Sequence, residues 1–381
     1  MDTTFSSRRL ALAALLLSTL LGALGASIAN VGLPALSAHF GAPYARIQWI
    51  VLAYLLASTA MALVAGRLGD RVGRRRVLLG GIVLFGAASG ACALAPSLPL
   101  LVAARALQGA GAAAMLVLSL PFAAEAGGRS GRTIGLLGSV SAAGTTLGPA
   151  IGGILLGGYG WPALFLAPVP LGALAFACAW RGLPAGPGPA GQPGARAALP
   201  WGALLANGSM TAIVMAILVI GPFHLTRSLG LGSAATGLAM ACGPLAAALA
   251  GAPAGRAVDR HGARAAARFG LACAAAACAL LVLLPASIAG YLVPVALLTT
   301  GYAVFQAANS SAVMAACAPD RRGAVSGMLA LSRNLGMLAG ASGMGMLFAA
   351  GGMRMAFAGA FLPLATAALG WRRMKEAMDR A

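Results

Sequence analysis

The stretch GRLGDRVGRRR, residues 66–76, lies between two long apolar segments, and a weaker copy, GRAVDRHGAR, occupies residues 255–264. Five positions recur at one spacing along the chain: Gly66, Asp70, Arg71, Gly73 and Arg75 in the first copy correspond to Gly255, Asp259, Arg260, Gly262 and Arg264 in the second. A short basic loop that recurs at matching places indicates an internal duplication. The chain is therefore expected to consist of two related halves.

Most of the chain is too apolar to be surrounded by water. Hydrophobic residues make up 60% of the sequence and charged residues only 9%, and the mean hydropathy is +0.89. Soluble domains carry about 25% charged residues. Lipid is thus the expected solvent for most of the chain.

The formal net charge of +19 is explained by membrane topology. Most of the lysines and arginines fall in the N-terminus, in the two basic loops, in other loops on the same side, and in the C-terminal tail. This is the positive-inside pattern, which predicts that the arginine-rich side is cytoplasmic. No basic aromatic surface or binding motif points to nucleic acid.

Apolar segments of about 20 residues are long enough to cross a bilayer as helices. Twelve can be placed, roughly at 10–36, 47–66, 77–95, 98–122, 134–157, 162–180, 202–225, 234–254, 266–286, 290–315, 323–349 and 354–371. We expect an all-α multi-pass membrane protein with both termini cytoplasmic. The first apolar run continues past the length of a signal-peptide core, so it is interpreted as an uncleaved first helix.

Residues 181–200, RGLPAGPGPAGQPGARAALP, divide the sequence. Their proline and glycine content argues against a helix and favours a flexible cytoplasmic linker. The expected organisation is an N-terminal six-helix bundle at 1–180, the linker at 181–200, and a C-terminal six-helix bundle at 201–381.

Five stretches in ordered sequence resemble the Major Facilitator Superfamily, and specifically its bacterial drug and metabolite exporters of the drug–proton antiporter type. They are SIANVGLP at 27–34, the basic loop at 66–76, LVAARALQGAGAA at 101–113, GTTLGPAIGG at 144–153 and WPALFLAPVPLG at 161–172. The resemblance implies two pseudo-symmetric bundles of six helices. It also implies export of small organic molecules by alternating access from a bacterial inner membrane, by a protein expected to be a monomer.

The basic loops are candidate gating elements. A carboxylate at the end of helix 2 can stabilise the positive N-terminus of a neighbouring helix, and the resemblance suggests that Asp70 does so for helix 11, near Gly323. A solvated basic loop is the alternative. The candidate gating residues of the two copies are Gly66, Asp70, Arg71, Gly73, Arg74, Asp259, Arg260 and Gly262.

Helix 5 carries a second candidate gating segment. Pro149, preceded by Gly148, predicts a kink, and Gly152 and Gly153 permit close contact with a partner helix. The functional interpretation is that helix 5 bends at the kink and closes the interface between the two halves. The alternative is an ordinary kinked membrane helix.

Arg105 is the most unusual residue, because it lies inside the apolar run of helix 4. Intramembrane charges usually serve function, although an arginine can also extend to the interface. Gln108, three residues later on the same helix face, supports a polar pocket there. The other candidates for substrate or coupling contacts are polar residues within apolar runs: Asn30, Gln48, Tyr54, Gln108, Asn207, Thr211, Gln306, Asn309, Arg333 and Asn334. Simple hydrogen bonding between helices is the alternative for the amides.

The acidic residues depart from the antiporter pattern. All seven, Asp2, Asp70, Glu125, Asp259, Asp320, Glu376 and Asp379, map to termini, loops or helix ends. The antiporters that the chain resembles usually carry an aspartate in helix 1, where this chain has Gly25. Proton coupling needs a buried titratable group, and Arg105 does not release a proton at ordinary pH. Protons remain a candidate coupling ion through Asp70, Glu125 or His224, and anionic or neutral cargo is favoured over a multivalent cation.

Other functions find less support in the sequence. An uncoupled facilitator or importer of a small metabolite is the alternative within transport, and a receptor or enzyme on the same fold is the alternative outside it. No P-loop is present, and no catalytic constellation or metal cluster can be assembled. We therefore expect no enzyme activity, cofactor or metal. The six cysteines lie in or beside apolar runs, as small packing residues do.

Overall fold

The computed structural model describes residues 2–125, 130–184, 201–315 and 322–378, and every regular element in these ranges is a helix. Some side chains within them, including those of Arg67 and Asp70, lie outside the described residues. The chain forms two compact units, which are Met1–Gln192 with Gly232–Leu238, and Pro193–Leu231 with Ala239–Ala381.

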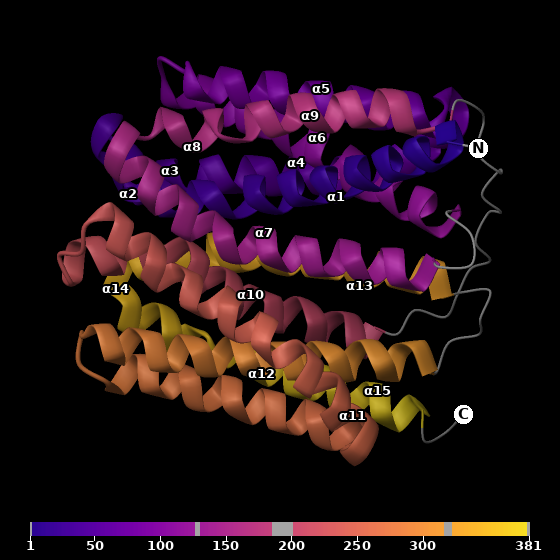
Figure 1. The fold of residues 1–381 in the computed structure, drawn as a ribbon. Coiled ribbons are helices and arrows are strands. Elements are labelled where there is room, and N and C mark those ends of the chain that lie inside the picture. The colour runs from indigo at the N-terminus through magenta and orange to yellow at the C-terminus, as the bar shows by residue number, and fades with distance from the viewer. Residues whose placement is uncertain (1, 126–129, 185–200, 316–321, 379–381) are drawn as a thin grey trace. The chain divides into compact units, whose positions relative to one another are not determined.

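The helices of the first unit run lengthwise beside one another (Figure 1). They are α1 (Asp2–Val31), α2 (Leu33–His39), α3 (Tyr44–Ile47), α4 (Trp49–Val72), α5 (Arg74–Ala93), α6 (Leu98–Glu125), α7 (Ser130–Tyr159), α8 (Pro162–Leu166) and α9 (Pro168–Gly182). Helix α6 packs against α4 and α5, and α1 packs against α7 and α9. Proline begins α8 and α9, where its missing N–H costs no helical hydrogen bond.

Most of the second unit is built from longer helical segments. They are α10 (Trp201–Phe223) with the π-helical turn η1 (His224–Ser228), α11 (Ser233–Leu283), α12 (Ile288–Ala315), α13 (Arg322–Ala339) with the π-helical turn η3 (Gly340–Met344), α14 (Gly345–Gly359) and α15 (Phe361–Met378). Helix α10 packs against α13 and α15. Helices α11 and α12 lie side by side in Figure 1, and Gly270 of α11 meets the backbone of Gly301 and Phe305 in α12.

Two expected pairs of helices are joined without a loop. Helix α11 contains both apolar segments expected at 234–254 and 266–286, and its two arms meet at Gly262, where φ is 78°. Gly351 and Gly352 likewise break α14 between the last two expected segments. The first basic loop is equally short, because Gly73, with φ 102°, is the single residue between α4 and α5. Such φ values favour glycine, which has no Cβ to clash.

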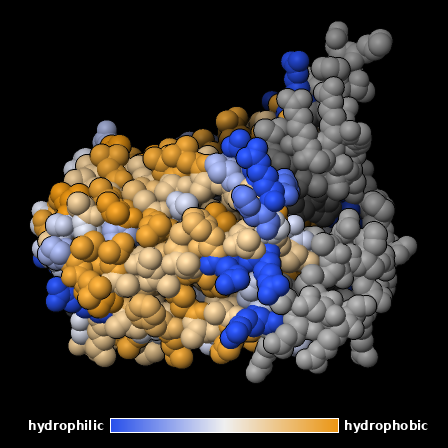
Figure 2. Space-filling model, turned by 90° about the horizontal axis from the view of Figure 1, so that it is seen from below, coloured by the Kyte–Doolittle hydropathy of each residue, from blue (hydrophilic) through white to orange (hydrophobic). Residues whose placement is uncertain are grey.

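Ten segments of the described residues are long and apolar enough to cross a membrane. One of them, Leu331–Arg372, spans 42 residues and includes both arms around Gly351. Helix α7 is not among the ten, and many of its side chains lie outside the described residues. Figure 2 shows one face that is mostly hydrophobic, with hydrophilic residues gathered chiefly in a band toward one side. The molecule is an all-α membrane protein.

Small residues allow the helices to approach closely. A Cβ on Gly109 of α6 would overlap the backbone oxygen of Tyr54 in α4, and one on Gly111 would lie 2.7 Å from the backbone nitrogen of Phe85 in α5. In the second unit, Gly336 of α13 meets the backbone of Gly208 in α10. Inside a bilayer the hydrophobic effect does not drive helices together, because lipid tails are as apolar as the side chains. Close backbone contacts of this kind stabilise the helix packing instead.

Candidate functional site

Arg105 of α6 lies in the packed interior of the first unit, with 1% of its surface exposed. Its Nε donates to the backbone oxygen of Ile50 in α4 at 3.0 Å, and its Nη1 donates to the backbone oxygen of Gly25 in α1 at 3.0 Å. Nη1 also donates to Oε1 of Gln108. The guanidinium therefore ties three helices together, and its burial excludes extension to a membrane surface.

Aromatic rings enclose the guanidinium. Its Cζ lies 4.3 Å from the ring centroid of Tyr54 and 5.9 Å from that of Phe165 in α8. The Tyr54 hydroxyl donates to the backbone oxygen of Gly22 at 3.0 Å. A cation over an aromatic face is stabilised by the ring quadrupole, more strongly when both are desolvated. Phe165 was not singled out from the sequence, although it lies within the stretch 161–172.

Gln108 extends the network to α5. Its Nε2 donates to Oγ of Ser89 at 2.7 Å, and Ser89 Oγ donates to the backbone oxygen of Phe85 at 2.7 Å. Ser89 was also missed by sequence reasoning, because serine in an apolar helix commonly bonds to its own backbone. The structure thus brings three of the candidate residues together, namely Tyr54, Arg105 and Gln108. The sequence placed Arg105 and Gln108 on one helix face but did not indicate Tyr54 as their neighbour.

Gly25 stands where the resemblance to drug–proton antiporters implied that an aspartate is usual. A Cβ there would lie 2.9 Å from Cε2 of Phe85 and 3.3 Å from the Tyr54 hydroxyl. Both distances are shorter than an ordinary van der Waals contact. The ring of Phe85 therefore fills the space that an acidic side chain would need.

The other two candidates of the first unit, Asn30 and Gln48, are buried apart from this network. Asn30 donates to the backbone oxygen of Ala26 at 3.4 Å, and Gln48 donates to that of Ala45 at 3.2 Å. The side-chain oxygen of each has no hydrogen-bond partner among the described residues. An unpaired buried acceptor is available to a ligand or a water molecule.

Polar residues of the second unit gather around α10. Asn207 Nδ2 donates to the backbone oxygen of Leu329 in α13 at 2.8 Å, and Asn309 Nδ2 of α12 donates to that of Ala203 at 3.4 Å. Thr211 Oγ1 lies 3.3 Å from the hydroxyl of Tyr302. The side-chain oxygens of Asn207, Asn309 and Gln306 have no partner among the described residues.

Arg333 does not repeat the environment of Arg105. It is exposed, and Asn334 beside it is partly buried. The neighbouring Ser332, which sequence reasoning missed, donates from Oγ to the backbone oxygen of Leu204. The two halves therefore use different polar contacts, one arginine-centred and one based on amides and hydroxyls.

The candidate gating glycines of α7 face α1 closely. A Cβ on Gly148 would overlap Oγ of Ser27, and one on Gly152 would lie 2.8 Å from Cγ1 of Val31. A Cβ on Gly153 would lie 2.5 Å from the backbone oxygen of Ser233, in the start of α11 that belongs to the same unit. Helix α7 continues through Pro149 from Ser130 to Tyr159 as one element.

In the basic loops the structure describes the glycines and most of the arginines. Gly66 and Gly73 have open space where a Cβ would be, as does Gly262 in the second copy. Arg71, Asp259 and Arg260 are exposed, and Arg74 is partly buried. The Asp70 side chain lies outside the described residues, as does that of Glu125.

Arg75 joins this loop to α9 through a contact that the sequence did not reveal. Its Nη2 donates to the backbone oxygen of Trp180, and its Cζ lies 5.3 Å from the centroid of the Trp180 ring. Trp180 in turn stacks on Phe176 with 5.9 Å between ring centroids.

No group of three or more His, Cys, Asp or Glu side chains that could hold a metal ion occurs within the described ranges. Among the ten apolar segments, only Pro253–Leu283 contains a carboxylate, Asp259, near its start. The candidate site is therefore a buried cation with uncharged polar and aromatic neighbours.

The model of the Major Facilitator Superfamily matches residues 15–221 and 205–379. The chain belongs to this superfamily of membrane transporters. An uncharacterized transporter of Escherichia coli strain K12, YebQ, is 30% identical over 82% of this chain and 83% of its own length.

Shorter matches reach higher identity. The riboflavin transporter RibZ of Clostridioides difficile is 36% identical over 154 residues, or 40% of this chain and 34% of RibZ. The multidrug resistance protein Stp of Mycobacterium tuberculosis is 40% identical over 154 residues, or 40% of this chain and 29% of Stp. The matched part of this chain thus spans about a third of the length of these two relatives.

Solved structures share the fold. A bacterial homologue of the human lysosomal transporter Spinster, in an inward-facing and occupied conformation, superposes with a TM-score of 0.79 at 17% identity over 96% of both chains. A point mutant of the nucleoside transporter NupG gives a TM-score of 0.75 at 12% identity, over 96% of this chain and 99% of NupG.

Proposed function

We propose that this protein exports small organic molecules across the bacterial inner membrane by alternating access. The observation that carries the proposal is the 40% identity to a multidrug resistance protein. A 36% match to the methylenomycin A resistance protein of Streptomyces coelicolor points the same way. Membership of a transporter superfamily and transporter-like neighbours in structure favour transport over an enzyme or a receptor.

The cargo we propose is neutral or anionic. The one charged side chain buried among the described residues is the Arg105 guanidinium, and no described carboxylate compensates it. A cation entering such an interior would meet an uncompensated like charge, which is costly at low dielectric. Each unit also has unpaired amide oxygens that can accept hydrogen bonds from uncharged donors: that of Asn30 in the first unit, and those of Asn207 and Asn309 in the second.

Proton coupling through helix 1 has no support in the side chains at that position. Gly25 offers no titratable group, and Phe85 fills the adjacent space. We propose that coupling, if the transporter uses protons, passes through Asp70 or Glu125 at the arginine-rich end, or through the charge of the cargo itself. An uncoupled facilitator or importer of a metabolite is the alternative that this acid distribution favours.

The gate we propose has two parts. Asp70 and the arginines of the first basic loop close the arginine-rich end, which we assign to the cytoplasm together with both termini. The face of α7 that carries Gly148, Gly152 and Gly153 seals against its neighbours. Two six-helix bundles at 1–180 and 201–381 would then rock against each other within one monomer. Most of the linker expected at 181–200 lies outside the described residues.

Riboflavin uptake into inside-out membrane vesicles tests direction and coupling together, because riboflavin is uncharged and fluorescent. An exporter concentrates it inside such vesicles when a gradient is imposed, and the accumulation collapses with an uncoupler if protons drive transport. Equal flux in both vesicle orientations without a gradient would support the facilitator instead. Fluorescein and ethidium, as an organic anion and an organic cation of comparable size, test the preference for charge.

A further inference from the structure

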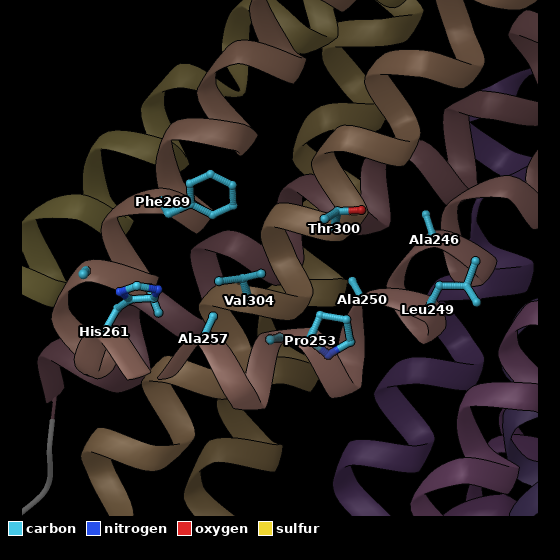
Figure 3. A pocket seen from close by; sticks show the side chains of 12 residues that line it. Ala246, Leu249, Ala250, Pro253, Ala257, His261, Phe269, Thr300 and Val304 are labelled. Atoms are coloured by element: carbon cyan, nitrogen blue, oxygen red, sulfur yellow. The ribbon is translucent and has the colours of Figure 1, made fainter. Parts of the chain in front are cut away.

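Two cavities of the second unit differ in the side chains that line them. The first, a groove of about 790 Å³, lies between the two arms of α11 and α12 (Figure 3). Ala257, Phe269, Val304 and their neighbours make its lining almost entirely apolar, and none of the described lining residues is an arginine or a lysine. Lipid tails are as apolar as such a lining, so the groove requires no specific ligand.

The second cavity, of about 160 Å³, is lined by two basic residues. His224 of η1 and Arg354 of α14 share it, and its other lining residues, from the end of α11, the turn after it, the start of α12 and Met353, carry no charge. All of them belong to the second unit. A water molecule takes up about 30 Å³ of liquid, so the cavity has room for one small ion or group and a few waters.

The protein supplies no counter-charge to this cavity in the part that the structure describes. The side chains of His224 and Arg354 have no hydrogen bond or ion pair to another described residue. The sequence places every acidic residue of this half at the opposite, arginine-rich end, namely Asp259, Asp320, Glu376 and Asp379. Arg354 is therefore a cation that needs an anion from outside the chain.

The backbone at His224 is also unusual. The π-helical turn η1 begins at this residue, and isolated π-helical turns occur frequently at functional sites. The imidazole stacks on the ring of Tyr291 in α12, with 6.1 Å between centroids and 28° between planes. Tyr291 has only 1% of its surface exposed. A buried ring thus holds the imidazole in place before any ligand arrives.

We propose that this cavity binds one oxyanion group, a carboxylate or a phosphate, between His224 and Arg354. A guanidinium offers paired donors that match two oxygens of such a group, and an imidazole offers one N–H donor when neutral and two when protonated. The apolar remainder of the lining strengthens these hydrogen bonds by lowering the local dielectric. The bound group would join η1 to α14, and it would do so whatever the cargo and the direction of transport.

Inorganic phosphate is the probe, and thermal unfolding of the full-length protein in non-ionic detergent is the measurement. A ligand that binds only the folded protein raises its melting temperature, so a saturable rise with phosphate, at constant ionic strength set with sodium chloride, is expected for the wild type. R354Q should weaken the apparent affinity about tenfold or more, since it removes a charged hydrogen-bonding partner. R227Q is the matched control, because Arg227 is exposed in the same turn but lies over Phe223 and does not line the cavity.

A second pair of variants supplies the missing carboxylate from the protein itself. Ala286 lines the cavity from the turn after α11 and is exposed, so a larger side chain there leaves the packed helices intact. A286E should neutralise the cavity and abolish the response to phosphate. A286Q, which has nearly the same size without the charge, should retain the response.

The same titration distinguishes the two sources of an oxyanion. A shift with inorganic phosphate identifies a free ion, whereas a shift with dioleoyl phosphatidylglycerol alone identifies a lipid head group. Either shift must be lost in R354Q and kept in R227Q. The proposal fails if neither compound gives a shift that depends on Arg354, or if R227Q loses the response as R354Q does. If R354Q does not fold, equal responses of A286E and A286Q overturn it.

Discussion

The guanidinium of Arg105 lies over the ring of Tyr54, with 4.3 Å between Cζ and the ring centroid, while both residues bond to backbone oxygens of α1. Arg105 reaches Gly25 and Tyr54 reaches Gly22. One pair of side chains, from α4 and α6, thus fixes the position of α1 in the first unit. The charge of Arg105 holds helices together and has no acidic partner among the described side chains.

Replacing Arg105 tests this role. R105M keeps the length of the side chain but removes every donor, so Gln108 Oε1 loses its partner and the Tyr54 ring loses its cation. We expect a loss of about 2 kcal/mol in stability, because charged hydrogen bonds contribute about 1.5–3 kcal/mol each and the cost of burying the charge offsets part of this. R105K should recover part of the loss, since an ammonium cannot reproduce the planar fork. Thermal unfolding in detergent is the measurement, and an R105M protein as stable as the wild type would contradict it.

Gly25 should resist even a methyl group. G25A places a Cβ 2.9 Å from Phe85, and overpacking of this kind costs about 1–3 kcal/mol. F85L removes part of the ring, so the double variant G25A/F85L should be more stable than the sum of the two single changes predicts. The thermal stability of the four proteins in this cycle measures the coupling. Additive effects would show that the ring does not restrict position 25.

The contact between α1 and α7 can be tested with two glycines of one helix. G148A would force a Cβ into Oγ of Ser27, whereas G157A in the same helix meets open space. We expect G148A to lower both stability and transport, and G157A to be neutral or slightly stabilising, since alanine favours a helix by about 1 kcal/mol over glycine. S27G should rescue G148A. Failure of the rescue would place the effect of G148A outside this contact.

Asp70 and Asp259 hold matching places in the repeat, but the arginine run after Gly73 is missing after Gly262. We therefore expect D70N to reduce transport several-fold at normal expression, and D259N to reduce it much less. Initial rates of riboflavin uptake into vesicles, normalised to the amount of protein, measure the difference. Equal rates in D70N and the wild type would remove the latch from the proposed gate.

The sequence predicted the helices well because a bilayer imposes one simple requirement, an apolar run of about 20 residues. It predicted that Arg105 and Gln108 lie on one helix face, because residues three apart in a helix are neighbours. It did not predict Tyr54, Phe165 or Ser89 as their partners, since these belong to other helices and only packing brings them close. Nor did it show that Arg333 is exposed, because its position in an apolar run is similar to that of Arg105.

Helix ends were harder to place than helices. The separate segments expected at 234–254 and 266–286 are joined in α11, because Gly262 turns the chain within a single residue. A loop of ordinary length was expected there from the polar composition of residues 255–264. A single glycine with a positive φ reverses the chain direction without such a loop.

This one-residue turn has a mechanical consequence. With only Gly262 between the arms, any change in the angle between the first and the second arm of α11 is concentrated in the backbone torsions at this residue. The separation of the arms is also the width of the groove lined by Ala257 and Phe269. The width of this groove therefore depends on the two backbone torsions of a single glycine.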